Sequence, residues 1–285
     1  LNDEDAVMNR LAVLGQPIAH SLSPAMHGAA FRALGIEREW SYEAIELSPE
    51  GFAAGVDELR SSGYVGANVT IPHKEAALEL ADEASAAADE IGAANTLSFT
   101  PVGVAAENTD APGLIAALPS DPAGAAALVL GAGGAARAAI WALREAGADV
   151  SVHNRTASRG AAVAAELGVE HLERDGELPA RRFDLIVNAT SVGLAKGGPA
   201  ASRPASGLKE LGFGADAFSD RQVVVDLVYG ATATELLAEA SRAGATVVEG
   251  REVLVRQGAE SFRIWTGLDP PLEPMRAATD SQPSS

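Results

Sequence analysis

Short apolar runs alternate with alanine-rich segments of helical length along most of this chain. The alternation is typical of βαβ units, in which buried strands pair in parallel and helices cover the sheet. The sequence therefore predicts an α/β fold. At 285 residues, the chain is long enough for about two such domains, each with a core of its own.

The expected elements fall into two series that meet near Ala111. The first series has strands at 11–14, 39–45 and 64–69, and helices at 25–34, 51–61 and 74–81. The second has strands at 126–130, 150–153, 185–188, 223–227 and 246–248, with helices at 135–146, 158–167 and 234–243. A last helix at 251–265 has no strand after it, which favours its return to the first domain. We expect a discontinuous first domain, residues 1–110 plus 250–285, and a second domain at 111–249.

The charge balance restricts the partners. The chain has 21 Lys and Arg against 39 Asp and Glu, a formal net charge of −18. Because such a surface repels nucleic acid and anionic lipid, we expect neither as a partner. Anionic ligands must instead meet local cations, hydroxyls or helix N-termini.

The composition and segment lengths lead to further expectations. Without cysteine the chain has no disulfide or thiolate nucleophile, and it suits a reducing cytoplasm. No apolar run is long enough to span a membrane. We expect residues 196–207 to form a Gly/Pro/Ser loop and 277–285 to be a disordered tail.

A glycine-rich turn, residues 131–136, follows the strand expected at 126–130. In this G-x-G-x-x-A pattern the first glycine permits a tight turn, and the second lets the backbone approach a pyrophosphate. The helix N-terminus that follows favours anions. A strand before and a helix after are the context that this signature needs, so we predict a Rossmann-type, doubly wound domain. The expected cofactor-binding residues of the turn are Gly131, Ala132, Gly133, Gly134 and Ala135.

The segment after the next strand indicates which dinucleotide binds. An NAD site would place an acid there for the ribose 2′-hydroxyl, whereas this chain has Asn154, Arg155, Thr156 and Arg159. Arginines without an acid suit a 2′-phosphate, so we predict NADP as the cofactor. The alternative is that Thr156 or Ser158 caps the next helix and that both arginines are solvated.

Two serines precede the helix expected at 25–34. Ser23, before Pro24, suits an N-cap, whereas Ser21 has no such structural role. Hydroxyls one residue apart at a helix N-terminus can bind the carboxylate of a small acid without adding charge. His20 and His27 lack partners at metal-binding spacing, so we expect both to serve in packing and we expect no metal site.

Lys74 follows a strand and lies in the first turn of a predicted helix. A cation there opposes the helix dipole, which marks Lys74 for function against the alternative of a solvated lysine. Asn95 and Asp110 add an amide and a carboxylate. Asp110 can equally serve as the cap of the helix that follows it.

Taken together, these motifs resemble shikimate dehydrogenase. The segments HSLSP, NVTIPHK, GAANT, ENTDA, GAGGAARA, NRT and NAT and the run from Gly250 to Gln257 occur in family-like order over about residues 10–267. The resemblance implies reduction of 3-dehydroshikimate to shikimate with NADPH, in a substrate domain and a Rossmann domain. It implies Lys74 and Asp110 as the catalytic pair, and Gly250 beside the cofactor. The substrate residues it implies are Ser21, Ser23, Thr70, Asn95, Asp110, Tyr229 and Gln257.

Three positions depart from the family pattern. Glu107 replaces a usual glycine, and Leu194 and Val253 stand where methionine is common near the nicotinamide. Two alternatives stay open, namely a quinate/shikimate dehydrogenase of relaxed substrate or cofactor use, and a catalytically silent NADP-binding relative. A folate-type NADP dehydrogenase shares the two-domain plan, but HSLSP argues against it. The oligomeric state is left open between monomer and homodimer.

Overall fold

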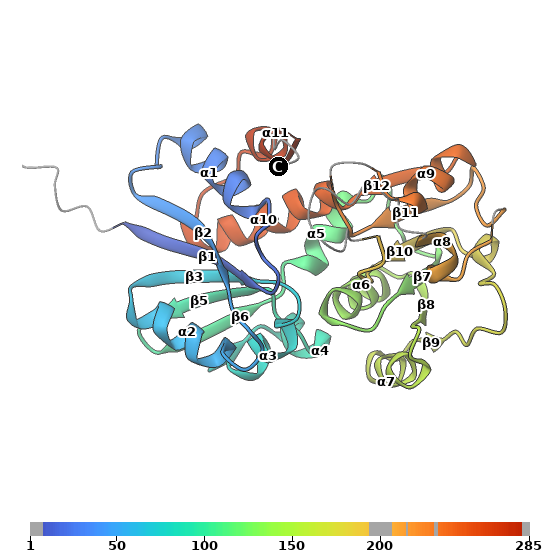
Figure 1. The fold of residues 1–285 in the computed structure, drawn as a ribbon, viewed down its shortest axis with the longest axis horizontal. Coiled ribbons are helices and arrows are strands. Elements are labelled where there is room, and N and C mark those ends of the chain that lie inside the picture. Colours follow the sequence, from blue (N-terminus) through green and yellow to red (C-terminus); the bar gives the residue numbers. More distant parts are fainter. Residues whose placement is uncertain (1–7, 194–206, 215, 231–232, 281–285) are drawn as a thin grey trace, which may run out of the picture. The chain divides into compact units, whose positions relative to one another are not determined.

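The computed structural model describes residues 8–193, 207–214, 216–230 and 233–280. These residues divide into two compact units (Figure 1). The first unit holds the described residues up to Gly113 and those from Leu254 onward, and the second holds those from Leu114 to Val253. Both changes of unit fall inside helices, α5 (Asp110–Ala117) and α10 (Gly250–Thr266).

Most elements of the first unit begin and end within two residues of the predicted positions. Besides its parts of α5 and α10, they are β1 (Asn9–Gly15), α1 (Ser23–Leu34), β2 (Trp40–Glu46), α2 (Phe52–Ser61), β3 (Tyr64–Val69), α3 (Lys74–Glu79), β4 (Glu83–Ala84), α4 (Ala86–Ile91), β5 (Thr96–Thr100), β6 (Gly103–Glu107) and α11 (Leu272–Asp280).

The sheet of the first unit is mixed, with the strand order β2-β1-β3-β5-β6-β4. β1 pairs in parallel with β2 and β3, whereas β5 is antiparallel to both β3 and β6. The expectation of a parallel sheet is therefore wrong for the β3–β5 and β5–β6 pairs. β5 and β6 are joined by a two-residue connection, and so short a connection permits only an antiparallel pair. The apolar pattern does not predict β4, α4, β5, β6 or α11.

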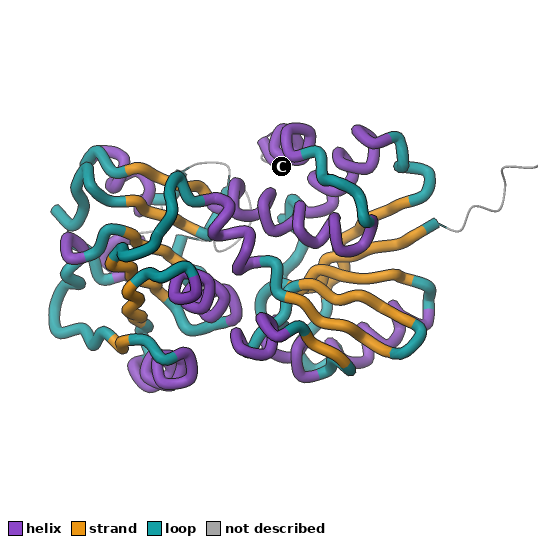
Figure 2. Tube along the Cα trace, turned by 180° about the vertical axis from the view of Figure 1, so that it is seen from behind, coloured by secondary structure: helices purple, strands orange, loops and turns teal. Residues whose placement is uncertain are grey.

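Alternate residues of β1 pack on opposite faces of this sheet, as the period of a strand requires. Ala12 and Leu14 belong to a core that includes α2 and α3. Leu11 belongs to a second core, formed with α1, α10 and α11, to which Phe262 and Met275 contribute. Figures 1 and 2 show α10 and α11 returning to the first unit, which confirms the predicted return of the C-terminal helix.

The predicted strands and helices of the second unit are present. Besides its parts of α5 and α10, the unit comprises β7 (Ala126–Leu130), α6 (Gly134–Glu145), β8 (Asp149–His153), α7 (Ala157–Leu167), β9 (Glu170–His171), the short 3₁₀ helix η1 (Ala180–Arg182), β10 (Leu185–Asn188), α8 (Gly207–Leu211), β11 (Val223–Asp226), α9 (Glu235–Arg242) and β12 (Thr246–Glu249).

The sheet of the second unit is parallel throughout, in the order β12-β11-β10-β7-β8-β9. Within this sheet the chain forms β7 in the middle first and then β8 and β9 on one side of it. It then forms β10, β11 and β12 on the other side of β7. This is the strand order of dinucleotide-binding Rossmann folds, with the switch point between β7 and β10. Ala127 and Val129 pack under α6 and α7, while Leu128 and Leu130 pack under α8 and α9. The predicted doubly wound fold is confirmed.

The predicted disordered tail is wrong for residues 277–280, which form the last turn of α11. Met275 and Thr279 of this helix are buried, and packing of the amphipathic helix offsets its polar composition. Residues 281–285 and 196–206 lie outside the described residues. In the described part of the chain, no helix combines the length and the apolar character needed to cross a membrane.

Candidate active site

Lys74 is the first residue of α3, as predicted, and the residue before it is firmly held. The buried His73 donates from Nε2 to the carbonyl oxygen of Leu47, 2.7 Å away. Its ring stacks on Phe52 with centroids 4.4 Å apart. The Lys74 ammonium group donates to Oδ2 of Asp110. Because the Lys74 side chain is only 12% exposed, this ion pair is largely shielded from solvent.

The second carboxylate oxygen of Asp110 is also engaged. Asn95 Nδ2 lies 2.9 Å from Oδ1 of Asp110 and 3.1 Å from Oε1 of Gln257. The Gln257 Nε2 group donates in turn to the carbonyl oxygen of Leu254. The structure thus brings together four predicted residues, Lys74, Asn95, Asp110 and Gln257.

The β5–β6 hairpin explains how Asn95 meets Asp110. Asn95 precedes β5, and its N–H donates to the carbonyl oxygen of Glu107, the last residue of β6. The start of α5 is capped by Asn108, whose Oδ1 accepts from the N–H of Ala111 at 3.2 Å. Asp110 is therefore not needed as a cap, and its carboxylate remains available to Lys74 and Asn95.

The N-cap expected of Ser23 is wrong. α1 begins at Ser23 itself, and the residue before it, Leu22, has no side chain that can cap the helix. Pro24 fits this register because proline is tolerated in the first turn, where N–H groups have no helical partner. The Ser21 hydroxyl instead accepts from the N–H of Ser23 at 3.3 Å. Ser21 therefore has a structural role that the sequence did not suggest.

Thr70 follows β3 at the same sheet edge as the loop after β1. Its N–H donates to the carbonyl oxygen of Leu14, and the next residue, Ile71, accepts from the N–H of Gln16. The Thr70 methyl packs so closely on Gly15 that a Cβ there would lie 2.4 Å from it. Ser21, Ser23 and Thr70 thus lie on loops at the sheet edge from which α3 also starts. The hydrogen bonds found among the described residues do not join their hydroxyls to Lys74.

Four polar residues that the sequence analysis leaves unassigned lie beside this cluster. Asn68, Thr96 and Thr109 belong to the quoted motifs NVTIPHK, GAANT and ENTDA, and Ser261 lies one turn after Gln257. All four are buried and hydrogen-bonded to one another or to Asn95. The sequence could have indicated Asn68, Thr96 and Thr109, because each is a polar residue inside a quoted motif to which the resemblance gave no role. The described residues hold no group of His, Asp or Glu side chains arranged to bind a metal.

In the second unit the glycine turn has the predicted geometry. Gly131 has φ +120°, and a Cβ there would lie 3.0 Å from the carbonyl oxygen of Ala189, so only glycine fits without strain. Gly133 precedes α6, and the space around its would-be Cβ is open. No side chain caps α6, so its first N–H groups are left for a ligand.

The predicted 2′-phosphate segment directly follows β8. Asn154 Nδ2 donates to the carbonyl oxygen of Thr156 at 2.9 Å, which closes a tight turn. Thr156 precedes α7, yet its side chain accepts no capping bond, which weakens the capping alternative for this residue. The side chain of Arg155 is 84% exposed, with Nη1 3.5 Å from Oε1 of Glu210, and Arg159 is exposed.

Asp226, at the end of β11, was not predicted as important. Its carboxylate is fully buried and accepts from Asn188 Nδ2 at 2.8 Å, the hydroxyl of Thr234 at 2.6 Å and the N–H of Val228 at 3.1 Å. Burial raises the pKa of Asp226, while these hydrogen bonds act in the opposite direction. The network fixes the loops after β10 and β11, at the edge where Rossmann folds bind their ligands.

The remaining predicted positions have these surroundings. Tyr229 follows β11, and burial raises the pKa of its phenol. Gly250 starts α10 so close to β11 that a Cβ would lie 2.6 Å from the carbonyl oxygen of Leu227, which is a packing reason for glycine. Val253 is buried in the core of the second unit. Glu107 ends β6, and Leu194 lies outside the described residues.

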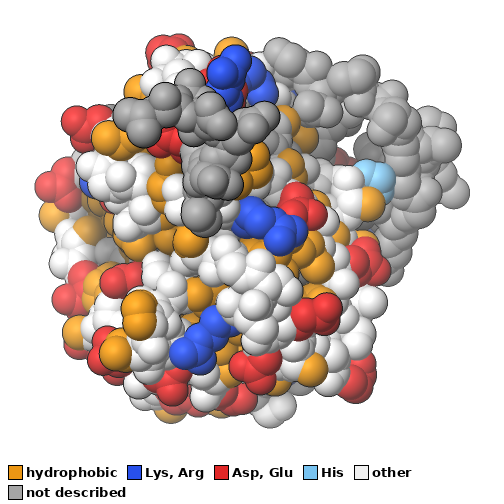
Figure 3. Space-filling view, turned by 90° about the vertical axis from the view of Figure 1, so that its left-hand side faces the viewer, with side chains coloured by type: hydrophobic (Ala, Val, Ile, Leu, Met, Phe, Trp, Pro, Cys, Tyr) orange, Lys and Arg blue, Asp and Glu red, His pale blue; other side chains and the backbone are white. Residues whose placement is uncertain are grey.

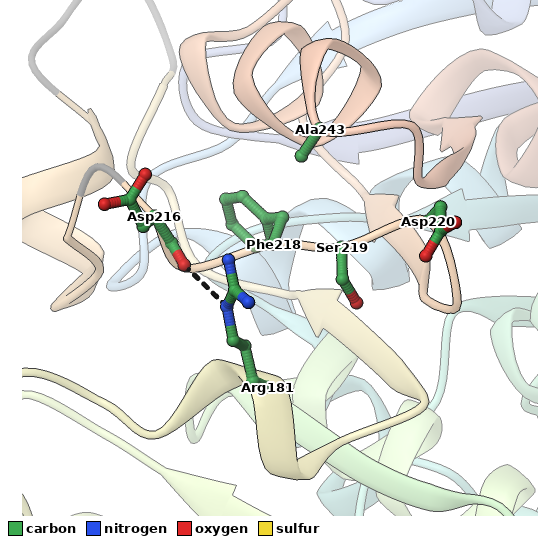
Figure 4. A pocket seen from close by; sticks show the side chains of 6 residues that line it. All are labelled: Arg181, Asp216, Phe218, Ser219, Asp220 and Ala243. Atoms are coloured by element: carbon green, nitrogen blue, oxygen red, sulfur yellow. Dashed lines mark hydrogen bonds between the residues drawn. The ribbon is translucent and has the colours of Figure 1, made fainter.

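A surface hollow of about 390 Å³ lies in the second unit, at the amino ends of the strands of its sheet (Figure 4). It is lined by Arg181, Asp216, Phe218, Ser219, Asp220 and Ala243, which precede β10, β11 and β12. Arg181 donates from Nε to the carbonyl oxygen of Asp216. Because the glycine turn lies at the carboxyl edge, this hollow is separate from the candidate cofactor site.

Three stretches of the chain match known protein families. Residues 13–97 match the shikimate dehydrogenase substrate binding domain. Residues 116–194 match shikimate / quinate 5-dehydrogenase, and residues 250–279 match the shikimate 5′-dehydrogenase C-terminal domain.

Individual relatives match nearly the whole chain. The shikimate dehydrogenase (NADP(+)) of Methanothermobacter thermautotrophicus is 43% identical over 276 residues, covering 93% of this chain and 94% of its own. A Thermus thermophilus enzyme of the same name is 46% identical over 266 residues, with coverages of 92% and 94%. The crystal structure of Thermus thermophilus shikimate 5-dehydrogenase with NADP(H) and shikimate superposes with a TM-score of 0.82 at 44% identity, covering 95% of this chain and 98% of that one.

Proposed function

The chain belongs to the shikimate dehydrogenase family, and we infer on that premise that it is an NADP-dependent oxidoreductase. Its reaction is the reversible reduction of 3-dehydroshikimate to shikimate, a step towards chorismate and the aromatic amino acids. The observation that carries this function is the shielded Lys74–Asp110 pair, in a chain more than 40% identical to enzymes of that name.

We assign proton handling to Lys74. NADPH, when bound, supplies the hydride that adds to the carbonyl carbon of the substrate. The carbonyl oxygen thereby gains an electron pair and needs a proton, which the Lys74 ammonium group carries at Nζ. Asp110 holds that nitrogen through Oδ2, and Asn95 holds the other carboxylate oxygen. The lysine therefore presents its remaining N–H bonds in a restricted direction.

We assign recognition of the substrate carboxylate to Ser21 and Ser23. Their support is the start of α1, a twelve-residue helix whose N-cap residue, Leu22, has no capping side chain and whose first N–H, that of Ser23, donates to the Ser21 hydroxyl. Hydroxyl and backbone N–H donors suit a carboxylate in a chain of net charge −18, because they add no exposed cation. Thr70, Asn95, Gln257 and Tyr229 are assigned to the substrate hydroxyls by resemblance.

The second unit suits NADP. The residues that would hold the pyrophosphate are the turn from Gly131 to Ala135, since α6 is uncapped and Gly133 leaves open space. Asn154, Thr156 and the exposed Arg155 and Arg159 would hold the adenosine end. Two arginines in a segment that contains no acid of its own favour a 2′-phosphate over a free hydroxyl, and Glu210 of α8 is the acid that lies near Arg155 in the structure. Gly250 is the last residue assigned to the cofactor.

One assay separates this function from its alternatives. Absorbance at 340 nm is followed with shikimate or quinate, each offered NADP+ or NAD+. We expect turnover with shikimate and NADP+ in clear excess over the other three pairs. Comparable rates with quinate or with NAD+ would indicate an enzyme of relaxed specificity. No turnover with any pair, despite binding of NADP+, would indicate a catalytically silent relative.

We further propose a cytoplasmic location, which the cysteine-free composition suits, and a state of monomer or homodimer. Light scattering coupled to size exclusion distinguishes the two states, because a dimer doubles the 29.0 kDa mass. A larger assembly would contradict both.

A further inference from the structure

Ser261 lies in α10, one turn after Gln257, with none of its surface exposed. Four atoms lie within hydrogen-bond distance of its hydroxyl oxygen. They are Asn68 Nδ2 at 2.9 Å, the carbonyl oxygen of Gln257 at 3.0 Å, and the hydroxyls of Thr96 and Thr109 at 3.2 Å each. This single hydroxyl therefore contacts α10, β3, β5 and the residue before α5.

Two of these partners are neighbours of candidate site residues. Thr96 follows Asn95, and Thr109 precedes Asp110. The N–H of Thr109 donates to Oδ1 of Asn95 at 2.7 Å. Because a backbone N–H can only donate, the side-chain oxygen Oδ1 of Asn95 must face Thr109. The NH₂ group of Asn95 must then face Asp110 and Gln257. The direction of the Asn95 amide thus depends on where Thr109 is held.

Asn68 fixes the other side of the same arrangement. Its Nδ2 donates to the main-chain carbonyl oxygen of Asn95 at 3.1 Å as well as to Ser261, and its Oδ1 accepts from the hydroxyl of Tyr42 at 2.8 Å. The Asn68 NH₂ group can only donate, so the Ser261 hydroxyl accepts at this contact, and the hydroxyl of Thr96 lies 3.1 Å from the same Nδ2 as a further acceptor. Asn68 therefore links Ser261, Thr96 and Asn95 on this side of the buried group.

We propose that Ser261 is a positioning residue for the reaction, which holds Thr96 and Thr109 so that Asn95 keeps Asp110 and Lys74 in line. The proposal rests on the proposed function. Ser261 is fully enclosed, so it acts through its neighbours and not by touching substrate. The competing interpretation is a helical serine that merely bonds the carbonyl oxygen one turn back, a common local arrangement without effect on the reaction.

Ser261→Ala tests the proposal, with Ser151→Ala as the matched control. Ser151 is a buried serine of β8 whose hydroxyl bonds to Glu170, outside the network. The readouts are the single-turnover rate of NADPH oxidation by 3-dehydroshikimate, the KM for that substrate, and the stoichiometry of NADPH binding. We expect Ser261→Ala to slow the single turnover about tenfold at full stoichiometry, with KM changed less than about threefold. A rate within twofold of the wild type, or a rise in KM larger than the fall in rate, would overturn the proposal.

A second pair of variants covers failure of Ser261→Ala to fold. Thr109→Val removes the hydroxyl that contacts both Ser261 and Asn95 Nδ2 while preserving shape, and Thr109→Ser retains it. We expect the valine variant to be slow and the serine variant to be near the wild type. Equal rates in the two variants would refute a role for this contact.

The proposed function and the positioning role can fail separately. If the wild type does not turn over 3-dehydroshikimate, the function fails, and crystal structures then decide the positioning role. We expect Ser261→Ala to lose the 2.9 Å bond from Asn95 to Asp110, or to divide it between conformers. An unchanged single conformer would overturn the proposal.

Discussion

At the scale of the residue, Lys74 stands where the helix dipole is least favourable to a cation. The structure offsets this through Asp110, whose carboxylate is shared between Lys74 and Asn95. The ion pair with Asp110 therefore stabilises the positive charge of Lys74, and the dipole of α3 does not. A residue placed against its local preference in this way is a better functional candidate than one that the helix favours.

Lys74→Met should reduce kcat by at least about 10²-fold, because it keeps most of the stem and removes the proton donor. The affinity for NADPH should stay nearly unchanged, since the turn that we propose for its phosphates belongs to the second unit. Steady-state kinetics and a fluorescence titration with NADPH measure the two quantities. Lys209→Met, which exchanges an exposed lysine of α8, serves as the control. A kcat within tenfold of the wild type in a folded Lys74→Met protein would exclude Lys74 as the proton donor.

Arg155→Asp should erase or reverse the preference for NADP+. The substitution replaces a cation suited to the 2′-phosphate with an acid suited to the ribose hydroxyl. Because the Arg155 side chain is 84% exposed, we expect a change of about tenfold in the ratio of kcat/KM for the two cofactors. Arg221→Asp makes the same exchange at another exposed arginine and should leave the ratio unaltered. An unchanged ratio in Arg155→Asp would show that Arg155 is only a surface residue.

At the scale of the element, the β5–β6 hairpin determines which side chains of the first unit meet. It returns the chain so that Thr96 pairs with Glu107, which brings Asn95 beside Asp110. An all-parallel arrangement would have needed a crossover between these strands. The connection of the hairpin lacks a dipeptide typical of tight turns, so the sequence pattern does not predict the hairpin.

The layer of α1, β2 and α10 contains His27, which is fully buried. Its ring stacks on Tyr42 with centroids 4.3 Å apart, and neither ring nitrogen has a hydrogen-bond partner within the described part of the chain. Burial lowers the pKa of His27 from 6.5 to about 3. Between these values the unfolded chain binds a proton that the folded chain does not. The stability is therefore complete above about pH 6.5 and falls as the pH drops towards 3.

From pH 8 to pH 5, His27 should account for a loss of about 2 kcal/mol of unfolding free energy. His27→Phe keeps the stacked ring and removes the titrating group, so this part of the pH dependence should vanish. Urea unfolding at the two pH values measures it. His20→Gln, on an exposed loop, controls for exchanging a histidine. A wild-type pH dependence in His27→Phe would mean that another group titrates.

At the scale of the whole molecule, the first unit is built from both ends of the chain, and its core requires α10 and α11. The second unit has its own two cores and a continuous sequence. On the face shown in Figure 3, acidic side chains outnumber basic ones, in keeping with the net charge of −18. Ligand charge must therefore be met by local groups, which is the role that we propose for the two serines and for the glycine turn.

Phe262→Ala should destabilise the first unit by about 3–5 kcal/mol, because it empties a fully buried site in α10. Hydrogen exchange should show lost protection in β1 and β3, far along the sequence from the substitution. Phe213→Ala is the matched control, since Phe213 is 1% exposed in a core of the second unit. It should reduce protection in β10 and β11 instead. Equal loss in both sheets from Phe262→Ala would contradict separate cores.

The sequence alone determined the features that depend on residues close together in the chain. Most strands and helices, the glycine turn and the position of Lys74 at a helix start follow from local periodicity and backbone preference. The ordered motifs also indicated the family. Only the tertiary structure decided which side chains meet, because Asn95 lies 15 residues from Asp110 and 162 from Gln257. It also assigned the hydrogen bond at the start of α1 to Ser21, and it revealed Ser261 and Asp226, whose importance comes from burial and from distant partners. Such contacts depend on the packing of whole elements, and that packing is not encoded within any single short segment.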